Sequence, residues 1–216
     1  MPPDHLIVPE EMSRRADVAL RALSVNSYFL DLGQAVKRAV EIAGASPCQK
    51  SKRGAVAFAR RRMYRNGDPF GQVMTVYACG HNRPAGSMTC AGTPSCEAAC
   101  KHLCDHAEAV AVKNWLAEFG DSESGHALFD IVHIELRQDD AGKWVPVPFD
   151  REGKPKGPSC ISCARYILCA DARLVWLWGI DGWRWWYAQD FLRDTLDELK
   201  LVDPSLLPLR IGAVST

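Results

Sequence analysis

Two short stretches of the sequence bring together residues that bind metals and move protons. His106 and Glu108 lie two positions apart in "CDHAEAVAV", and Cys160 and Cys163 form a Cys-x-x-Cys pair in "PSCISCARY". One imidazole and two thiolates make a three-ligand set for zinc, which leaves the fourth tetrahedral position open for water, as in catalytic sites. Zinc lowers the pKa of its bound water to about 7 and so supplies hydroxide at neutral pH. We therefore predict a hydrolytic zinc site, with Glu108 placed to shuttle protons rather than to bind the metal.

The same residues allow three simpler interpretations. A Cys-x-x-Cys pair at a helix start is also typical of redox dithiols, because the positive end of the helix dipole lowers the pKa of a thiol. A capped helix start beside two buried thiols would carry the same residues without any chemistry. A non-catalytic zinc scaffold would need the three ligands but not Glu108. We favour the hydrolytic site because neither a dithiol nor a scaffold requires the His-x-Glu pair.

The periodicity of apolar residues predicts the elements that position these side chains. We expect helices over 12–24, 31–44, 105–119, 160–170 and 189–201, and strands over 53–61, 72–80, 130–137, 172–179 and 183–188, with a further short strand after Gly142. The strand over 130–137 alternates apolar and polar residues, which is typical of a half-buried strand. Because strands and helices alternate, we expect one α/β domain in which helices cover the faces of a sheet.

Three local signals set the boundaries of these elements. Asn66-Gly67 is a strong turn signal, so the strands on either side of it should form an antiparallel hairpin. Asp105 is a candidate N-cap for the helix that carries Glu108. Asp181-Gly182 should turn the chain between the last two strands.

We expect the chain to have three parts. Residues 1–48 form an N-terminal helical segment that packs on the core, 49–202 form the zinc-dependent domain, and 203–216 form a tail. The domain carries a cysteine-rich insert at 83–104 and a hairpin-and-loop insert at 138–157.

Composition restricts the partners and the location. The 26 basic and 26 acidic residues cancel, so no global positive field demands a nucleic-acid partner, although a local patch would suffice. The N-terminus lacks the layout of a secretory signal, and no apolar run approaches the roughly 18 residues of a membrane span. We therefore expect a cytoplasmic protein without a membrane partner. A toxin exported by another route would have the same features.

The two motifs and their flanking strands resemble those of the zinc-dependent nucleobase deaminases, which share H-x-E followed by P-C-x-x-C. The similarity to the cytidine deaminase-like superfamily covers about residues 50–200: "KRGAVAF" resembles its first strand, "ACGHNRPAG" its second strand and sugar-contacting loop, and "CARYILCADARLVWLW" the helix and strand after its second motif. The resemblance implies a three-layer α/β/α fold with a five-stranded mixed sheet. It also implies that His106, Cys160 and Cys163 hold zinc and that Glu108 is the general acid/base.

Further roles and one subgroup follow from the same resemblance. Asn82 matches the asparagine that contacts the sugar, the Ala107 backbone would face the base carbonyl, and Ser159 would border the substrate. The displaced proline (Pro158 before Ser159) and the long stretch between the motifs resemble bacterial toxin-type deaminases. Their tail is similar to that of this chain at Val175–Trp178, Trp183, Tyr187, Asp190-Phe191 and Thr195-Leu196. The Asp181-Gly182 turn would make the last two strands antiparallel, which argues against the parallel strand pair of the tRNA adenosine and APOBEC-type deaminases.

The resemblance implies hydrolytic deamination of cytosine, with attack on C4 while Glu108 transfers protons to N3 and to the leaving ammonia. The toxin-like tail favours DNA as the substrate, and single-stranded DNA would be easiest because a paired base must first be flipped out. Arg60, Arg61, Arg62 and Arg65 surround Tyr64 at the hairpin, a combination that suits phosphates and base stacking, or a solvated turn. The alternative substrate is free deoxycytidylate or cytidine, because "GHNRP" and a metal-like cluster before H-A-E also resemble deoxycytidylate deaminases.

A second group of cysteines precedes the histidine motif. Cys90, Cys96, Cys100 and Cys104 could hold a second, structural zinc ion, and His102 could replace one of them. The alternatives are apolar packing of free thiols, or disulfides if the protein is exported. The remaining cysteines outside the motif, Cys48, Cys79 and Cys169, are expected in the core.

Overall fold

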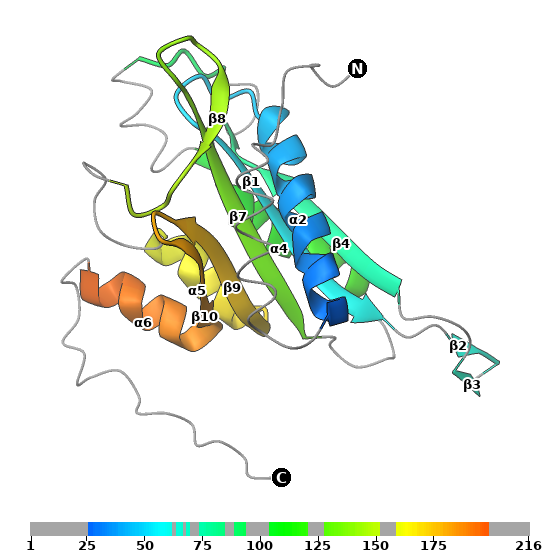
Figure 1. Cartoon of the computed structure of the whole chain (residues 1–216). Helices are drawn as coiled ribbons and strands as arrows, with labels where there is room; N and C mark the ends of the chain where they lie inside the picture. Colours follow the sequence, from blue (N-terminus) through cyan, green and yellow to red (C-terminus); the bar gives the residue numbers. More distant parts are fainter. Residues whose placement is uncertain are drawn as a thin grey trace.

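The computed structural model describes residues 26–61, 64–66, 68–69, 74–84, 89–93, 104–120, 128–151 and 159–198. These residues form a mixed α/β fold (Figure 1). Its helices are α2 (Asn26–Gly44), α4 (Ala107–Phe119), α5 (Ile161–Cys169) and α6 (Ala188–Glu198). Its longer strands are β1 (Lys52–Arg61), β4 (Met74–His81), β7 (Phe129–Gln138), β8 (Trp144–Val147), β9 (Ala172–Gly179) and β10 (Gly182–Tyr187). Two short pairs complete it, β2 (Tyr64–Arg65) with β3 (Asp68–Pro69), and β5 (Arg83–Pro84) with β6 (Cys104–Asp105).

The central sheet is mixed, with the strand order β10-β9-β7-β1-β4. Strand β1 is antiparallel to β4 and β7, while β7 and β9 are parallel. The predicted hairpin between β1 and β4 is confirmed, and so is the antiparallel pairing of the last two strands, β9 and β10. The sheet has six strands rather than five because β8, in the predicted insert, pairs with the end of β7 beyond β9.

Helices lie on both faces of this sheet. Successive side chains of a strand point to opposite faces, and both faces carry apolar side chains that the helices cover. On β1, Ala55 and Ala57 belong to the apolar cluster that includes residues of α4, α5 and α6, whereas Val56 and Phe58 pack with α2. The helices approach the strands closely. A Cβ atom on Gly80 of β4 would lie 2.5 Å from the Ala107 carbonyl oxygen at the start of α4. The first turn of α4 is therefore held tightly against the sheet.

Strand β7 is buried on both faces, so the prediction of a half-buried strand is wrong. Val132 and Ile134 pack in the cluster with α2, and Ile131 packs on the opposite face with α4 and α5. His133 and Glu135 lie on that opposite face, where the apolar cluster ends. The polar residues of the alternating pattern therefore point to a second covered face and not to solvent.

The helix that carries Glu108 begins later than predicted, and the assignment of Asp105 as its N-cap is wrong. The N-cap residue is His106, with an extended backbone. Asp105 instead belongs to β6, pairs with Arg83 of β5 and makes an ion pair with its side chain, with Nε and Oδ2 3.1 Å apart. Strand pairing thus competes with capping and places His106 at the junction of β6 and α4.

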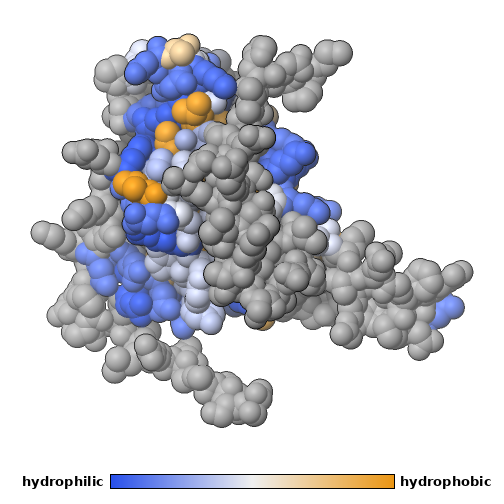
Figure 2. Space-filling model, in the orientation of Figure 1, coloured by the Kyte–Doolittle hydropathy of each residue, from blue (hydrophilic) through white to orange (hydrophobic). Residues whose placement is uncertain are grey.

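Among the described residues, the exposed large apolar and aromatic side chains are Leu116, Leu128, Tyr166, Ile180, Trp185 and Tyr187. The described part of the face shown in Figure 2 is mostly hydrophilic, with a few separate hydrophobic residues. Within the described ranges, none of the helices has the length and apolar character needed to cross a membrane. The helix predicted over 12–24 lies outside the described residues, and the division of the chain into 1–48, 49–202 and 203–216 stays a prediction.

Candidate metal centre

The structure brings His106, Cys160 and Cys163 together, although 54 or more positions separate the histidine from the cysteines. The Nδ1 atom of His106 lies 3.2 Å from Sγ of Cys160 and 3.2 Å from Sγ of Cys163. The three ligand atoms lie within 4.8 Å of one another. In the described part of the chain, this is the group of histidine, cysteine and acidic residues that could hold a metal ion.

Two helix starts converge to build this group. His106 immediately precedes α4, and Cys160 is the N-cap of α5, where its Sγ accepts a hydrogen bond from the Cys163 backbone N–H at 3.4 Å. Helix N-termini carry a partial positive charge, which favours thiolates. The Cys-x-x-Cys spacing therefore puts both sulfurs on the first turn of α5, facing the imidazole.

The protonation of the two thiols reflects their contact. A hydrogen bond between the two thiol side chains lowers the pKa of the Cys160 thiol to about 5, against the effect of burial. The same side-chain hydrogen bond, together with burial, raises the pKa of the Cys163 thiol. The pKa of His106 is raised mainly by its hydrogen bond to Cys160, although burial lowers it. The thiol of Cys160 therefore loses its proton more readily than the thiol of Cys163.

Glu108 lies beside these ligands and is buried, with a residue exposure of 4%. Burial raises its pKa, but the positive charges of His133, His106 and Arg53 outweigh burial and hold the pKa at about 2. Its Oε2 atom is buried and has no hydrogen-bond partner among the described residues. We expect this oxygen to accept a hydrogen bond from a water molecule or a ligand, because buried polar atoms are nearly always hydrogen-bonded.

The other carboxylate oxygen of Glu108 has two neighbours. Oε1 lies 3.6 Å from Nδ1 of His133, and it accepts a hydrogen bond of 3.3 Å from the Ser159 hydroxyl. The predicted contact of Ser159 with the substrate stays a prediction, and the structure shows its hydroxyl against the carboxylate of Glu108. The prediction missed His133, although a histidine inside a buried strand was the available signal.

The substrate contacts predicted for Asn82 and Ala107 stay predictions, and the structure shows what else these residues do. The amide of Asn82 is buried and ties two segments together: Oδ1 accepts hydrogen bonds from the Ser46 hydroxyl and the Arg53 backbone N–H, and Nδ2 donates to the Ser51 carbonyl. Ala107 is fully buried at the first turn of α4. Asn82 therefore has a structural role next to the site.

The predicted nucleic-acid hairpin lies away from the metal centre. Arg60 and Arg61 are at the far end of β1, where their backbones pair with β4, and Tyr64 and Arg65 form β2 beyond it (Figure 1). Seven residues separate Arg60 from Arg53, which at about 3.3 Å per residue is roughly 23 Å. Arg62 and the side chains of the others lie outside the described residues, so their contact with nucleic acid stays a prediction.

Arg53, at the near end of β1, is the arginine that reaches the site. Burial lowers its pKa, but the charges of Glu135, Glu108 and the two cysteine sulfurs raise the pKa above its ordinary value. Its side chain also lies opposite Glu135 in the register of β1 and β7. No motif in the sequence distinguishes this residue from the other arginines.

The second cysteine group is described only in part. Cys90 Sγ lies 3.8 Å from Cys48 Sγ and accepts a hydrogen bond from the Gln49 backbone N–H, and Cys104 belongs to β6. Cys96, Cys100 and His102 lie outside the described residues, so the second zinc ion stays a prediction. Of the three cysteines expected in the core, Cys48 is buried and Cys79 is half-buried. Cys169 is exposed at the end of α5, so that expectation is wrong.

No protein-family model matches this sequence, and no curated protein matches it either. The likeness to the cytidine deaminase-like superfamily therefore rests on the two motifs and on the strands beside them.

Proposed function

We propose that this protein is a zinc-dependent hydrolytic deaminase that converts cytosine to uracil and ammonia, with DNA as the favoured substrate. The observation that carries the proposal is the position of Glu108. This buried carboxylate adjoins a His/Cys/Cys group and keeps one oxygen without a partner among the described residues. A redox dithiol or a zinc scaffold has no use for a buried carboxylate at that place.

The residues present fit a zinc ion. One imidazole nitrogen and two thiolates are ligands that zinc prefers, and three protein ligands leave a position for water. Zinc bound by His106, Cys160 and Cys163 would supply a Lewis acid that activates a water molecule. The orphaned Oε2 of Glu108 is the hydrogen-bond acceptor that such a water needs.

Glu108 would perform the proton transfers of the reaction. Its low pKa keeps it ionised at neutral pH, so it can accept a proton from the attacking water. It then delivers that proton to N3 of the cytosine ring as the water oxygen bonds to C4. The remaining proton of that oxygen passes through Glu108 to the amino group, which leaves as ammonia when the C4–N bond breaks. His133 and Ser159 hold Oε1, which leaves Oε2 for the reacting atoms.

The fold gives further support to this assignment. The resemblance implies a three-layer α/β/α domain with a mixed sheet whose last two strands are antiparallel. In this chain β9 and β10 are antiparallel, and helices lie on both faces of a mixed sheet. Antiparallel pairing argues against the tRNA adenosine and APOBEC-type deaminases, and the likeness of the tail to that of toxin-type deaminases is the reason for favouring DNA. Free deoxycytidylate or cytidine is the alternative substrate.

The proposal is tested by supplying the substrates in parallel. The zinc-loaded protein is incubated with deoxycytidylate, cytidine, single-stranded DNA and duplex DNA, and uracil is counted by mass spectrometry after digestion to nucleosides. We expect uracil in DNA, most of all in single strands. Uracil only in the free nucleotide or nucleoside would replace DNA by the alternative substrate. Absence of uracil in every reaction would overturn the deaminase assignment.

A further inference from the structure

Three arginines converge on one buried carboxylate beside the candidate metal centre. The side chain of Glu135 is 3% exposed. Its Oε1 accepts hydrogen bonds from Nε of Arg137 at 2.7 Å and from Nη2 of Arg151 at 2.9 Å, and its Oε2 lies 3.5 Å from Nη2 of Arg53. Three positive charges therefore surround a single negative one.

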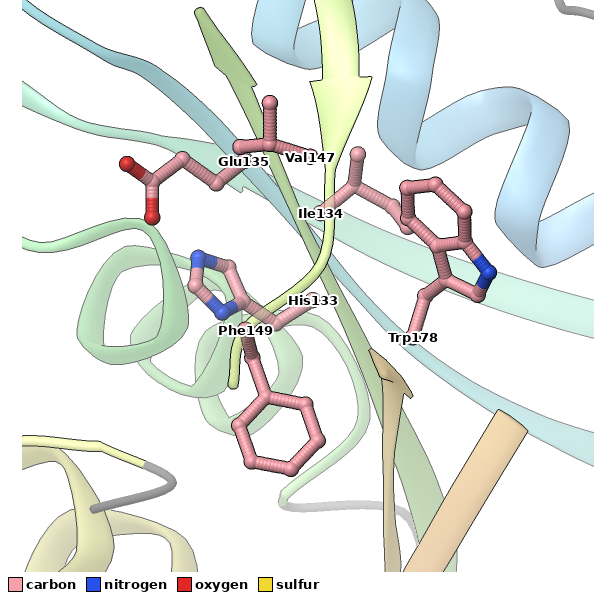
Figure 3. A pocket seen from close by; sticks show the side chains of 6 residues that line it. All are labelled: His133, Ile134, Glu135, Val147, Phe149 and Trp178. Atoms are coloured by element: carbon pink, nitrogen blue, oxygen red, sulfur yellow. The ribbon is translucent and has the colours of Figure 1, made fainter. Parts of the chain in front are cut away.

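The sheet places this arginine group next to the proposed site of reaction. His133 and Glu135 project from the same side of β7, and Ile134 and Trp178 lie on the other side, as Figure 3 shows. Both polar residues line one small pocket. Two residues along a strand span about 6.6 Å. His133 contacts the Glu108 carboxylate, and Glu135 lies two residues further along β7. The arginine group is therefore about this distance from the proposed general acid/base.

The arginines keep hydrogen-bond donors that Glu135 does not use. Arg137 binds Glu135 through Nε, and in the part of the chain that the structure describes its two terminal nitrogens have no partner. Nε of Arg53 is buried and likewise has no hydrogen-bond partner among the described residues. The side chains of Arg53, Arg137 and Arg151 are 30%, 34% and 23% exposed, so a ligand can reach them from solvent.

An ion-pair network that only stabilises the fold would not require three arginines around the single carboxylate of Glu135. One arginine in bidentate contact neutralises one carboxylate, and Arg151 already places both terminal nitrogens on Glu135. Arg53 also lies near Glu108, whose charge raises the pKa of its guanidinium. Arg137 then adds a positive charge beyond those of the two carboxylates, at a partly exposed position where an anion can share it. The guanidinium fork matches the oxygens of a phosphate group.

We propose that Arg53, Arg137 and Arg151 form a phosphate-binding site and that Glu135 holds their guanidinium groups in place. This inference rests on the proposed function and defines its substrate class. The substrate is a cytosine nucleotide that carries a phosphate, either a free 5′-monophosphate or a phosphodiester of DNA. A nucleoside that lacks the phosphate is then a poor substrate.

The test compares deoxycytidine 5′-monophosphate with deoxycytidine, which differ only in the phosphate. The readout is the ratio of kcat/KM for the two substrates with the zinc-loaded protein. We expect Arg137→Gln and Arg151→Gln each to lower this ratio about tenfold, which is the size of a lost hydrogen bond between charged groups. Arg38→Gln, an exposed arginine of α2, is the matched control and should leave the ratio unchanged.

A variant that binds the nucleotide more tightly provides a control, because misfolding could otherwise explain the losses seen in the arginine variants. Glu135→Gln keeps an amide oxygen that can hold the guanidinium groups but removes the competing negative charge, so the Kd of deoxycytidine monophosphate, measured by calorimetry, should fall several-fold. An unfolded variant cannot bind more tightly. The conservative Arg137→Lys variant keeps the positive charge but loses the planar guanidinium. Its ratio of kcat/KM for nucleotide and nucleoside should lie between those of the native protein and Arg137→Gln.

The outcomes separate this inference from the proposed function. Equal kcat/KM values for nucleotide and nucleoside, unaffected by the arginine variants, would overturn the phosphate site while deamination stands. If no substrate is turned over, the proposed function fails, and calorimetry with the nucleotide and the nucleoside still decides the phosphate site. Turnover of DNA alone, with a shallower salt dependence of DNA binding in the arginine variants, would assign the site to the phosphodiester.

Discussion

The imidazole of His133 lies against the carboxylate of Glu108, with Nδ1 and Oε1 3.6 Å apart, although the two residues come from a central strand and from the start of a helix. The positive charge of His133 is also the strongest of the effects that lower the pKa of Glu108. His133 is therefore a positioning residue for the proposed general acid/base. In the proposed mechanism it acts through Glu108.

Replacement of His133 tests this role. We expect His133→Gln to lower kcat about tenfold while zinc content and KM stay as in the native protein, because glutamine keeps a polar contact to Oε1 but has no positive charge. Steady-state kinetics with metal analysis gives both values. A fall in zinc content together with kcat would show that His133 merely supports the fold of the site.

Removal of the Ser159 hydroxyl frees Oε1 of Glu108 on its other side. A hydrogen bond to a charged group contributes about 1.5–3 kcal/mol. Since the carboxylate keeps its contact with His133, we expect Ser159→Ala to lower kcat several-fold at constant zinc content. Ser162→Ala, an exposed serine of α5, is the matched control. Equal kinetics of the two variants would remove Ser159 from the proposed machinery.

Metal content tests the ligand set directly. Purified protein should contain one zinc ion per chain, or two if the cysteine-rich insert binds its own. Cys163→Ala should lower the content by one ion, whereas Cys169→Ala should not, because Cys169 is exposed on the same helix. Inductively coupled plasma mass spectrometry measures the ratio. A Cys163→Ala protein with undiminished zinc would contradict the site.

Close packing of α4 against β4 should be needed to hold the site. A Cβ atom on residue 80 would lie 2.4 Å from the Ala111 backbone nitrogen, so Gly80→Ala must displace the helix that follows His106. Overpacking of this kind costs about 1–3 kcal/mol. We expect a lower free energy of unfolding and weaker zinc binding. Gly33→Ala is the control, because a Cβ atom there meets no neighbour and helix propensity should stabilise it by about 0.5–1 kcal/mol.

The arginine hairpin has its own test because it lies far from the metal centre. Replacement of Arg60, Arg61 and Arg62 by alanine should make the dependence of DNA affinity on salt shallower, by about 0.7 in the log–log slope for each lost contact with single-stranded DNA. Turnover of deoxycytidine should be unaffected. An unchanged slope in fluorescence anisotropy titrations would identify the hairpin as a solvated turn.

The sequence predicts the elements of this fold well where the local signals are strong. Asn66 takes a left-handed backbone, with φ of 53°, in the predicted Asn66-Gly67 turn. Gly182, in the predicted Asp181-Gly182 turn, also has a positive φ. The helix start at Asp105 was mispredicted because the strand that competes for this residue is formed with Arg83, 22 positions earlier. Capping propensity is local, whereas that pairing is not.

The candidate site likewise contains residues that local motifs predict and residues that only the fold brings together. Its ligands could be found because His-x-Glu and Cys-x-x-Cys each lie within one helix turn. The arginine group could not, because Arg53, Glu135 and Arg151 become neighbours only through the register of β1 with β7 and the return of the chain after β8. The alternation along β7 contained the missing information. His133 and Glu135 lie on the face that also packs against α4, where His133 contacts Glu108.

The most direct test of the central claim is to measure zinc content and uracil formation in the same preparation of Glu108→Ala. Glu118→Ala, an exposed glutamate of the same helix, is the matched control. We predict that Glu108→Ala retains one zinc ion at the His106, Cys160 and Cys163 site but loses deamination, whereas Glu118→Ala retains both. Undiminished deamination by zinc-loaded Glu108→Ala would contradict the account.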